Sequence, residues 1–337
     1  MLDYCAPENS KVTQLFSPTP VTIKDITTKT GRTRVFWVRQ EKIHDKVPLV
    51  LLHGWGAGSG CFFKNIAEMA PDRPVLLIDL PGFAESERID FGDYENVEEV
   101  WLDALKSVLD VEIGNGNYWL AGHSFGAYLA GLMSMEEKLN IDGVILMDAW
   151  GYAIMTETFE EKLARMPWYG RAAYHMFFKN SKRTGLDLMR AFPKSIGKIT
   201  LSDNLYKLFS AQPLMKRTRG DLTRRYGEFF MDYTFEINSA TPATGEIAFS
   251  KLMAGFGYAK NPLEKRILDN LEKLPDQVHF VYGGKSWVSP HSGQVIQKAI
   301  DSTSKNSTVS IIDGATHHLM CTHPSEFNQI VNKILDV

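Results

Sequence analysis

Short β-rich runs alternate with helical patterns over the first half of the chain, and this alternation limits the possible folds more than any other feature. Between two of these runs, apolar residues from Val97 to Leu109 recur at the spacing of one helix face. Such alternation predicts a mostly parallel sheet with crossover helices. The predicted strands are residues 21–26, 34–38, 48–52, 74–79, 118–121, 143–147, 277–282 and 307–312.

The alternation stops after Trp150 and resumes at Gln277. The segment between these residues holds basic and aromatic stretches with several Pro and Gly and no clear strand. We therefore expect one α/β sheet of about eight strands, with a large helical cap inserted after the sixth strand. The expected parts are an N-terminal extension at 1–20, a core at 21–150 and 277–337, and a basic cap at 151–276.

The net charge of −3 conceals a strong asymmetry. Residues 162–225 hold 15 Lys and Arg against 3 Asp, a local charge of +12, while the rest of the chain carries −15. Aromatic residues are interleaved with these cations, a combination typical of anionic membrane or lipid-droplet surfaces. The alternative is a solvated basic face over core aromatics. Nucleic acid is disfavoured, because no binding motif accompanies the charge. Within this segment we expect five cations to bind the lipid surface: Lys216, Arg217, Arg219, Arg224 and Arg225.

Cysteine usage and the start of the chain bear on its compartment. Cys5, Cys61 and Cys321 are odd in number and far apart, so a disulfide framework is not expected. The chain shows neither a signal-peptide pattern nor an apolar run of 18 residues. We expect a cytoplasmic protein that associates with intracellular membranes or lipid droplets only peripherally.

The strongest chemical signal is the pentapeptide GHSFG at residues 122–126, which lies between a predicted strand and a helical pattern. A Ser on such a turn needs small neighbours, because the backbone is strained and tightly packed. The following helix also directs its positive end at the Ser. This placement predicts that Ser124 is a nucleophile, the alternative being a plain tight turn.

A second motif, HGWG at residues 53–56, directly follows the strand predicted at 48–52. Acyl-transfer enzymes of this architecture need a backbone N–H there, aimed at the developing oxyanion. We expect the N–H groups of Trp55 and Phe125 to form this oxyanion hole. The alternative is an ordinary Gly-rich loop.

A serine hydroxyl also needs a base to take its proton. His317 follows the last predicted strand and is the best placed of the nine His. His318, next to it, is expected to point elsewhere. No Cys or carboxylate completes a metal site around His317, His318 and His323, so we expect no metal and no cofactor.

On these motifs the chain resembles the α/β-hydrolase superfamily. Within it, the chain resembles a narrower lipid-acting abhydrolase branch, which includes a lysophospholipase for N-acyl phosphatidylethanolamine and a lipid-droplet coactivator of adipose triglyceride lipase. The specific segments of this resemblance are PVLLIDLPGFAESER, DAWGY, PATGEIAFSKLMAGFGYAKNPL and HPSEFN. The resemblance implies an α/β-hydrolase fold and a lipid substrate.

The chain departs from this branch at two positions. The family's triad acid follows the penultimate strand, where this chain has Ser289. The family also has an Asp five residues after the catalytic His, linked to proposed acyltransferase activity, where this chain has Thr322. Some members place the acid after the sixth strand, and Asp148 occupies that place here. Asp148 is therefore a candidate triad acid, the alternative being a loop cap.

The sequence thus predicts a serine esterase that cleaves acyl esters of phospholipids, lysophospholipids or related lipids. The rival prediction is a coactivator that docks on lipid droplets and has a triglyceride lipase as its partner. Intact Ser124 and His317 favour the enzyme, whereas Ser289 favours the coactivator.

Overall fold

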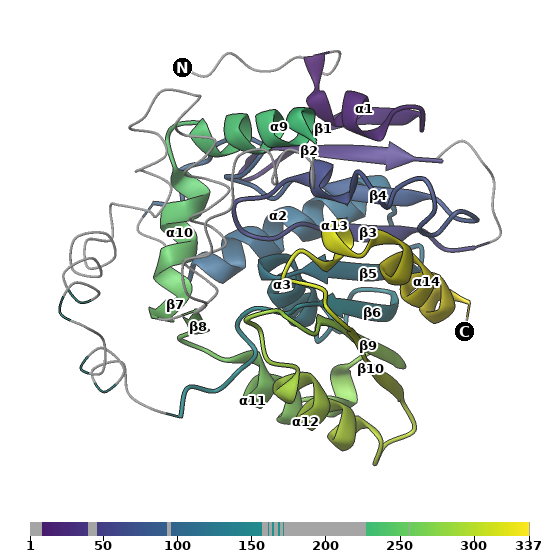
Figure 1. Ribbon diagram of the computed structural model, residues 1–337, viewed down its shortest axis with the longest axis vertical. Coiled ribbons are helices and arrows are strands. Elements are labelled where there is room, and N and C mark those ends of the chain that lie inside the picture. Colours follow the sequence, from purple (N-terminus) through teal and green to yellow (C-terminus); the bar gives the residue numbers. More distant parts are fainter. Residues whose placement is uncertain are drawn as a thin grey trace.

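An eight-stranded sheet forms the centre of the molecule (Figure 1). The structure, a computed structural model, describes residues 9–39, 46–92, 96–156, 227–255 and 257–336, and the single positions 161, 164, 168 and 171. The strands are β1 (Val21–Thr28), β2 (Gly31–Val38), β3 (Leu49–Leu52), β4 (Val75–Ile78), β5 (Tyr118–His123), β6 (Ile141–Met147), β9 (Gln277–Gly283) and β10 (Asn306–Ile312). All eight predicted strands are confirmed, with ends shifted by at most three residues.

The strands lie in the order β1-β2-β4-β3-β5-β6-β9-β10. β2 pairs antiparallel with β1 and β4, and every other pair is parallel. The mostly parallel sheet is thus confirmed. Because parallel strands end at one edge, the loops that follow them meet there, as ligand sites in open α/β sheets do.

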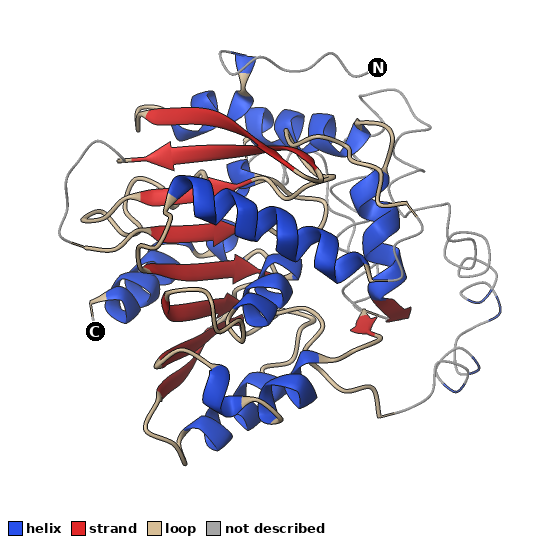
Figure 2. Cartoon of the chain, turned by 180° about the vertical axis from the view of Figure 1, so that it is seen from behind, coloured by secondary structure: helices blue, strands red, loops and turns tan. Residues whose placement is uncertain are grey.

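Helices cover both faces of the sheet (Figures 1 and 2). One layer holds α2 (Val97–Glu112), α3 (Phe125–Met133), α11 (Leu263–Leu268) and α12 (His291–Ile300), with the short η3 (Leu271–Lys273) beside them. The other layer holds α1 (Lys11–Phe16), η2 (Ser59–Phe62), α13 (Leu319–Thr322) and α14 (Pro324–Leu335).

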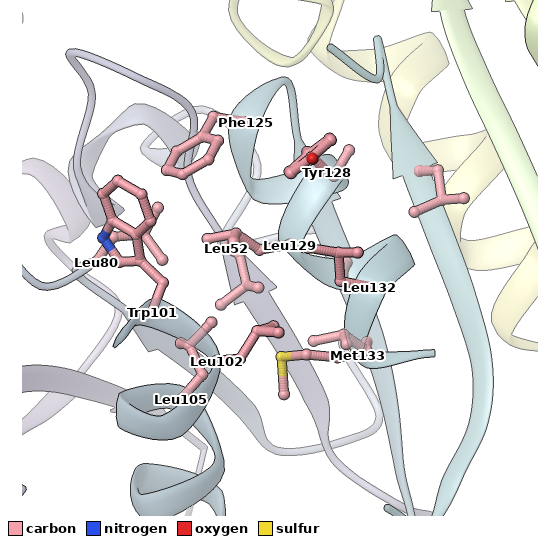
Figure 3. Packing of buried hydrophobic residues seen from close by; sticks show 14 of the residues in the cluster. Leu52, Leu80, Trp101, Leu102, Leu105, Phe125, Tyr128, Leu129, Leu132 and Met133 are labelled. Atoms are coloured by element: carbon pink, nitrogen blue, oxygen red, sulfur yellow. The ribbon is translucent and has the colours of Figure 1, made fainter. Parts of the chain in front are cut away.

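The two covered faces explain why the central strands read as continuous apolar runs. Along β3, Val50 and Leu52 join one buried cluster, while Leu49 and Leu51 join the other. Figure 3 shows part of the first cluster, with Leu52 beside residues of α2 and α3. This packing on both sides holds the ends of β3 and β5 in fixed positions.

The chain between β6 and β9 carries α9 (Glu228–Ser239), α10 (Thr244–Leu252), β7 (Met253–Gly255) and β8 (Tyr258–Ala259). α10, β7 and β8 lie beyond the carboxyl ends of the parallel strands (Figure 2). The prediction of no strand in this segment is wrong, because β7 and β8 pair as a short antiparallel sheet. They span only three and two residues, too few for a period-two pattern to be recognised.

Much of the predicted cap, including Lys216, Arg217, Arg219, Arg224 and Arg225, lies outside the described residues. Within the residues that the structure describes, no helix is long and apolar enough to cross a membrane.

Candidate active site

Ser124 occupies the sharp turn between β5 and α3, as the sequence predicts. Its backbone has φ 54° and ψ −112°, an uncommon conformation for a residue other than Gly. The flanking glycines are needed because the chain packs closely here. A Cβ on Gly122 would lie 2.2 Å from the carbonyl oxygen of Gly126, and one on Gly126 would lie 2.4 Å from that of Leu52. The strained turn lifts the Ser124 side chain out of the strand.

His317 lies in the loop between β10 and α13, with its ring between two other side chains. Its Nε2 is 3.0 Å from Oγ of Ser124, and its Nδ1 is 3.0 Å from Oδ2 of Asp148. An ionised carboxylate can only accept hydrogen bonds, so the Nδ1–H group of His317 donates a hydrogen bond to Asp148. Nε2 is then left to accept the proton of the Ser124 hydroxyl. These are the contacts that a serine nucleophile, a histidine base and an orienting acid would need.

Asp148 follows β6 directly and is fully buried. Its φ is 45°, a second strained backbone in the same site. Its Oδ1 accepts the backbone N–H of Gly283, at the end of β9, at 3.1 Å. Burial raises the pKa of Asp148, while His317, the Ser286 side chain and the Gly283 N–H oppose that rise. The acid is thus held from the neighbouring strand.

Ser289, at the position of the family's usual acid, lies apart from this arrangement. It is exposed, and its hydroxyl accepts the backbone N–H of His291 at the start of α12. Ser289 has no carboxylate, and its hydrogen bond is to His291 and not to His317, so it does not serve as a triad acid.

Two more histidines and a tryptophan surround His317. The buried His123 lies with its Nε2 2.8 Å from the backbone carbonyl oxygen of His317. Burial lowers the pKa of His123 well below its usual value, and the nearby His317 adds to this effect, so His123 is neutral and donates this bond. The rings of His318 and Trp287 lie 5.4 Å and 5.1 Å from that of His317. Sequence analysis missed His123 and Trp287, although His123 directly precedes Ser124.

The loop after β3, residues 53–58, lies against Ser124. A Cβ on Gly54 would lie 3.0 Å from Cβ of Ser124. The ring of His53 holds this loop, because its Nε2 accepts the backbone N–H of Leu80 at 2.9 Å and its Nδ1 lies 2.8 Å from the Gly54 carbonyl oxygen. Burial lowers the pKa of His53 to about 4, so the ring is neutral. Trp55 therefore comes next in the chain to a glycine that touches Ser124.

An aromatic cluster joins this loop to α10. The ring of Phe249 lies 4.5 Å from that of Trp150, 4.9 Å from that of Phe125 and 6.0 Å from that of Trp55. Phe125 opens α3, so its backbone N–H has no acceptor within that helix. Figure 3 shows Phe125 above Leu52 in the core layer. These three aromatic residues lie close in sequence to the site. Phe125 follows Ser124, and Trp55 follows Gly54, which lies against Ser124. Trp150 comes two positions after Asp148, which contacts His317.

Thr322 and His323 form hydrogen bonds close in sequence to His317. The Thr322 hydroxyl accepts the backbone N–H of Thr316 at 3.4 Å and lies 3.1 Å from Nδ1 of His323. Among the described residues, no three His, Cys, Asp or Glu side chains are arranged to hold a metal ion.

The fold and this site define the class of the protein. A family model described as "Alpha/beta hydrolase family" matches residues 49–330, so the chain belongs to the α/β-hydrolase family, as its motifs indicate.

Individual relatives narrow the comparison. The chain is 30% identical to 1-acylglycerol-3-phosphate O-acyltransferase ABHD5 of Homo sapiens, over 87% of its own length and 79% of that protein. It is 28% identical to the (Lyso)-N-acylphosphatidylethanolamine lipase of Homo sapiens, over 87% and 80% of the two chains. These relatives confirm the resemblance to a lipid-acting branch. Among solved structures, bromoperoxidase from Bacillus anthracis superposes with a TM-score of 0.64 at 18% identity, covering 94% of this chain and all of that one, which supports the fold.

Proposed function

We propose that this protein is a serine hydrolase that cleaves acyl esters of phospholipids, lysophospholipids or related lipids. The observation that carries the proposal is the continuous contact from Ser124 through His317 to Asp148, at 3.0 Å on each side of the imidazole. A serine hydroxyl is a weak nucleophile without such a base.

In the first half of the reaction, Nε2 of His317 takes the proton of Ser124 while Oγ attacks the ester carbonyl carbon. Asp148 keeps the imidazole in the required tautomer and stabilises the imidazolium that forms. The carbonyl oxygen becomes an oxyanion, which we assign to the backbone N–H groups of Trp55 and Phe125. One donor of this kind typically contributes 10²–10³-fold to kcat.

In the second half, the tetrahedral intermediate collapses and the leaving alcohol takes the proton from His317. This leaves an acyl group on Ser124. Water then loses a proton to His317 and attacks the acyl carbon. The second intermediate collapses to release the fatty acid, and His317 returns the proton to Oγ of Ser124. These steps use side chains of this chain and water, so we propose no metal or organic cofactor.

The lipid nature of the substrate rests on the relatives and on the charge pattern. The relatives are named for acyl chemistry on a glycerophosphate and on N-acylphosphatidylethanolamine. The local charge of +12 within residues 162–225 suits a surface of anionic headgroups. We therefore propose a peripheral position on lipid droplets or intracellular membranes of the cytoplasm, with Lys216, Arg217, Arg219, Arg224 and Arg225 as contacts.

A second candidate function is coactivation of a triglyceride lipase on a lipid droplet. Ser289 at the family's acid position favours it, since a member without a triad acid has reason to act by binding. The contact between Asp148 and His317 weakens that reason, because it supplies an acid from another strand. Acyl transfer to a lysophospholipid is the less favoured use of the acyl group, because Thr322 replaces the family's Asp.

Turnover of defined esters tests the proposal. We expect the wild type to hydrolyse a short-chain acyl ester and a lysophospholipid. Ser124→Ala should lose about 10³-fold or more, because it removes the nucleophile and little packing. Equal rates for the two proteins would overturn the enzyme proposal and leave coactivation as the better candidate. If the short ester is cleaved but neither a phospholipid nor a lysophospholipid is, the proposed lipid substrate class is overturned and the hydrolase activity stands.

A further inference from the structure

We infer that Asn238 of α9 is a positioning residue for the oxyanion hole. The inference rests on the proposed function, because it gives the Trp55 N–H the role assigned above. Asn238 lies in the last turn of α9, is 2% exposed and comes from the chain inserted between β6 and β9. The hydrogen bonds of its side chain go to Gly56 and Thr234, not to Ser124 or His317. We therefore expect any effect of Asn238 on the reaction to pass through the loop at residues 53–58.

The side-chain amide of Asn238 lies directly on that loop. Its Nδ2 donates to the carbonyl oxygen of Gly56 at 2.7 Å and to that of Thr234, one turn back in α9, at 2.9 Å. The second bond fixes the rotamer that makes the first. Gly56 has φ 65°, and a Cβ there would lie 3.2 Å from Oδ1 of Asn238. A glycine at this position therefore allows the close approach of the amide.

The bond to Gly56 reaches Trp55 through two peptide units. The Gly56 carbonyl shares a planar peptide with the N–H of Ala57, which donates to the Gly54 carbonyl at 3.2 Å. The Gly54 carbonyl in turn shares a planar peptide with the N–H of Trp55. In a trans peptide the two groups point in opposite directions, so fixing this carbonyl fixes the direction of the Trp55 N–H.

The arrangement is therefore a short chain of amide hydrogen bonds that ends at the oxyanion donor. Such chains polarise their members in the same sense, which strengthens the final N–H as a donor. His53 holds the same Gly54 carbonyl from the other side at 2.8 Å. The loop is thus held by Asn238 of α9 and, through its own His53, by the backbone N–H of Leu80.

Asn238 is itself firmly held. Arg88 donates to the carbonyl oxygens of Ile237 and Gly82 at 2.6 Å and 2.7 Å, and pairs with Glu246 of α10 at 2.7 Å. The side chains of this ion pair are 7% and 1% exposed. The end of α9 is therefore tied to the loop after β4 and to α10, so the position of α9 and the direction of the Trp55 N–H are linked.

The test compares Asn238→Ala with Asn328→Ala. Asn328 is 3% exposed, lies in α14 and bonds to Asn65 and Glu68, which are outside the loop at residues 53–58. Both changes remove a buried amide from a helix. Rates are expressed per active site, counted by fluorophosphonate titration, so that a loss of folded protein does not lower kcat.

We expect Asn238→Ala to lower kcat about 10- to 100-fold, less than the loss of an oxyanion donor itself, with KM within about 2-fold. A trifluoromethyl ketone, which adds reversibly to the serine and forms an oxyanion, should lose affinity by the same factor. Asn328→Ala should lower the melting temperature by a similar amount and leave kcat and this affinity unchanged. If Asn238→Ala does not fold, Asn238→Asp carries the test, because it keeps the shape and lacks the donor.

Each other outcome overturns a definite claim. An active wild type with an equally active Asn238→Ala overturns the role of Asn238 and leaves the proposed function in place. Parallel losses of kcat in both variants show a general structural effect and also overturn it. A wild type that neither cleaves esters nor reacts with the fluorophosphonate overturns the proposed function and this inference together.

Discussion

The carboxylate of Asp148 lies 3.0 Å from Nδ1 of His317, although the two residues are 169 positions apart in the chain. Asp148 follows β6, whereas the family's usual acid follows the penultimate strand, where this chain has the exposed Ser289. The side chain that contacts the base has therefore moved to the neighbouring strand, and the base has kept its place. The predictions below test whether this relationship supports catalysis.

Asp148→Asn should lower kcat by about 10³- to 10⁴-fold, because the imidazole loses the partner that fixes its tautomer. Ser289→Ala should change kcat less than 2-fold and serves as the matched control. Steady-state hydrolysis of a short acyl ester measures both. The opposite ranking would show that the acid acts from the usual position of the family.

Asp148→Asn should also leave the melting temperature at pH 7 equal to that of the wild type or higher. Burial raises the pKa of this carboxyl in the folded state, so its ionisation weakens the fold as pH rises through that pKa. The neutral amide lacks this effect. The difference in melting temperature between variant and wild type should shrink as pH falls toward 4, as calorimetry across pH can measure. If Asp148→Asn melts below the wild type at pH 7, and this deficit shrinks as the pH falls, the predicted direction of the effect is wrong.

Ser286→Ala should shift the acid limb of the pH profile of kcat/KM to higher pH. The Ser286 side chain favours the ionised form of Asp148 and opposes the rise in its pKa, so its loss lets that pKa rise further. Ser302→Ala, at an exposed serine after α12, is the control. An unshifted profile would show that Ser286 does not act on the acid.

Replacing Lys216, Arg217, Arg219, Arg224 and Arg225 together with Gln should weaken binding to anionic vesicles strongly. Each cation near such a surface contributes about 1 kcal/mol, and added salt screens the attraction. Co-sedimentation with phosphatidylserine vesicles and with neutral phosphatidylcholine vesicles, at low and high salt, measures this. Equal binding to both vesicles without salt dependence would show that the basic segment serves another partner.

Local patterns carry most of what the sequence predicts correctly. The central strands follow from apolar runs buried on both faces, and the position of Ser124 follows from glycines that only a tight turn between β5 and α3 requires. The candidacy of Asp148 follows from its place at the end of a strand beside that of Ser124. These features depend on neighbours in the sequence or on the order of parallel strands.

The contacts that the sequence does not reveal are tertiary. Gly283 contacts Asp148 and Asn238 contacts Gly56 across gaps of more than a hundred residues, with no periodic pattern to mark these contacts. A single serine or asparagine in a loop or helix looks the same whether it faces solvent or a buried carbonyl. Only the packing of the end of α9 onto the loop after β3 distinguishes the two cases.

Covalent labelling of Ser124 by a fluorophosphonate tests the central claim most directly, because it requires an activated serine whatever the natural ester. The probe should add one phosphonyl group to the wild type, located by peptide mass spectrometry on Ser124. Ser124→Ala should not be labelled, and His317→Ala and Asp148→Asn should react orders of magnitude more slowly. Labelling of the wild type at the same rate as His317→Ala, or no labelling at all, would contradict the account of Ser124, His317 and Asp148 as a working triad.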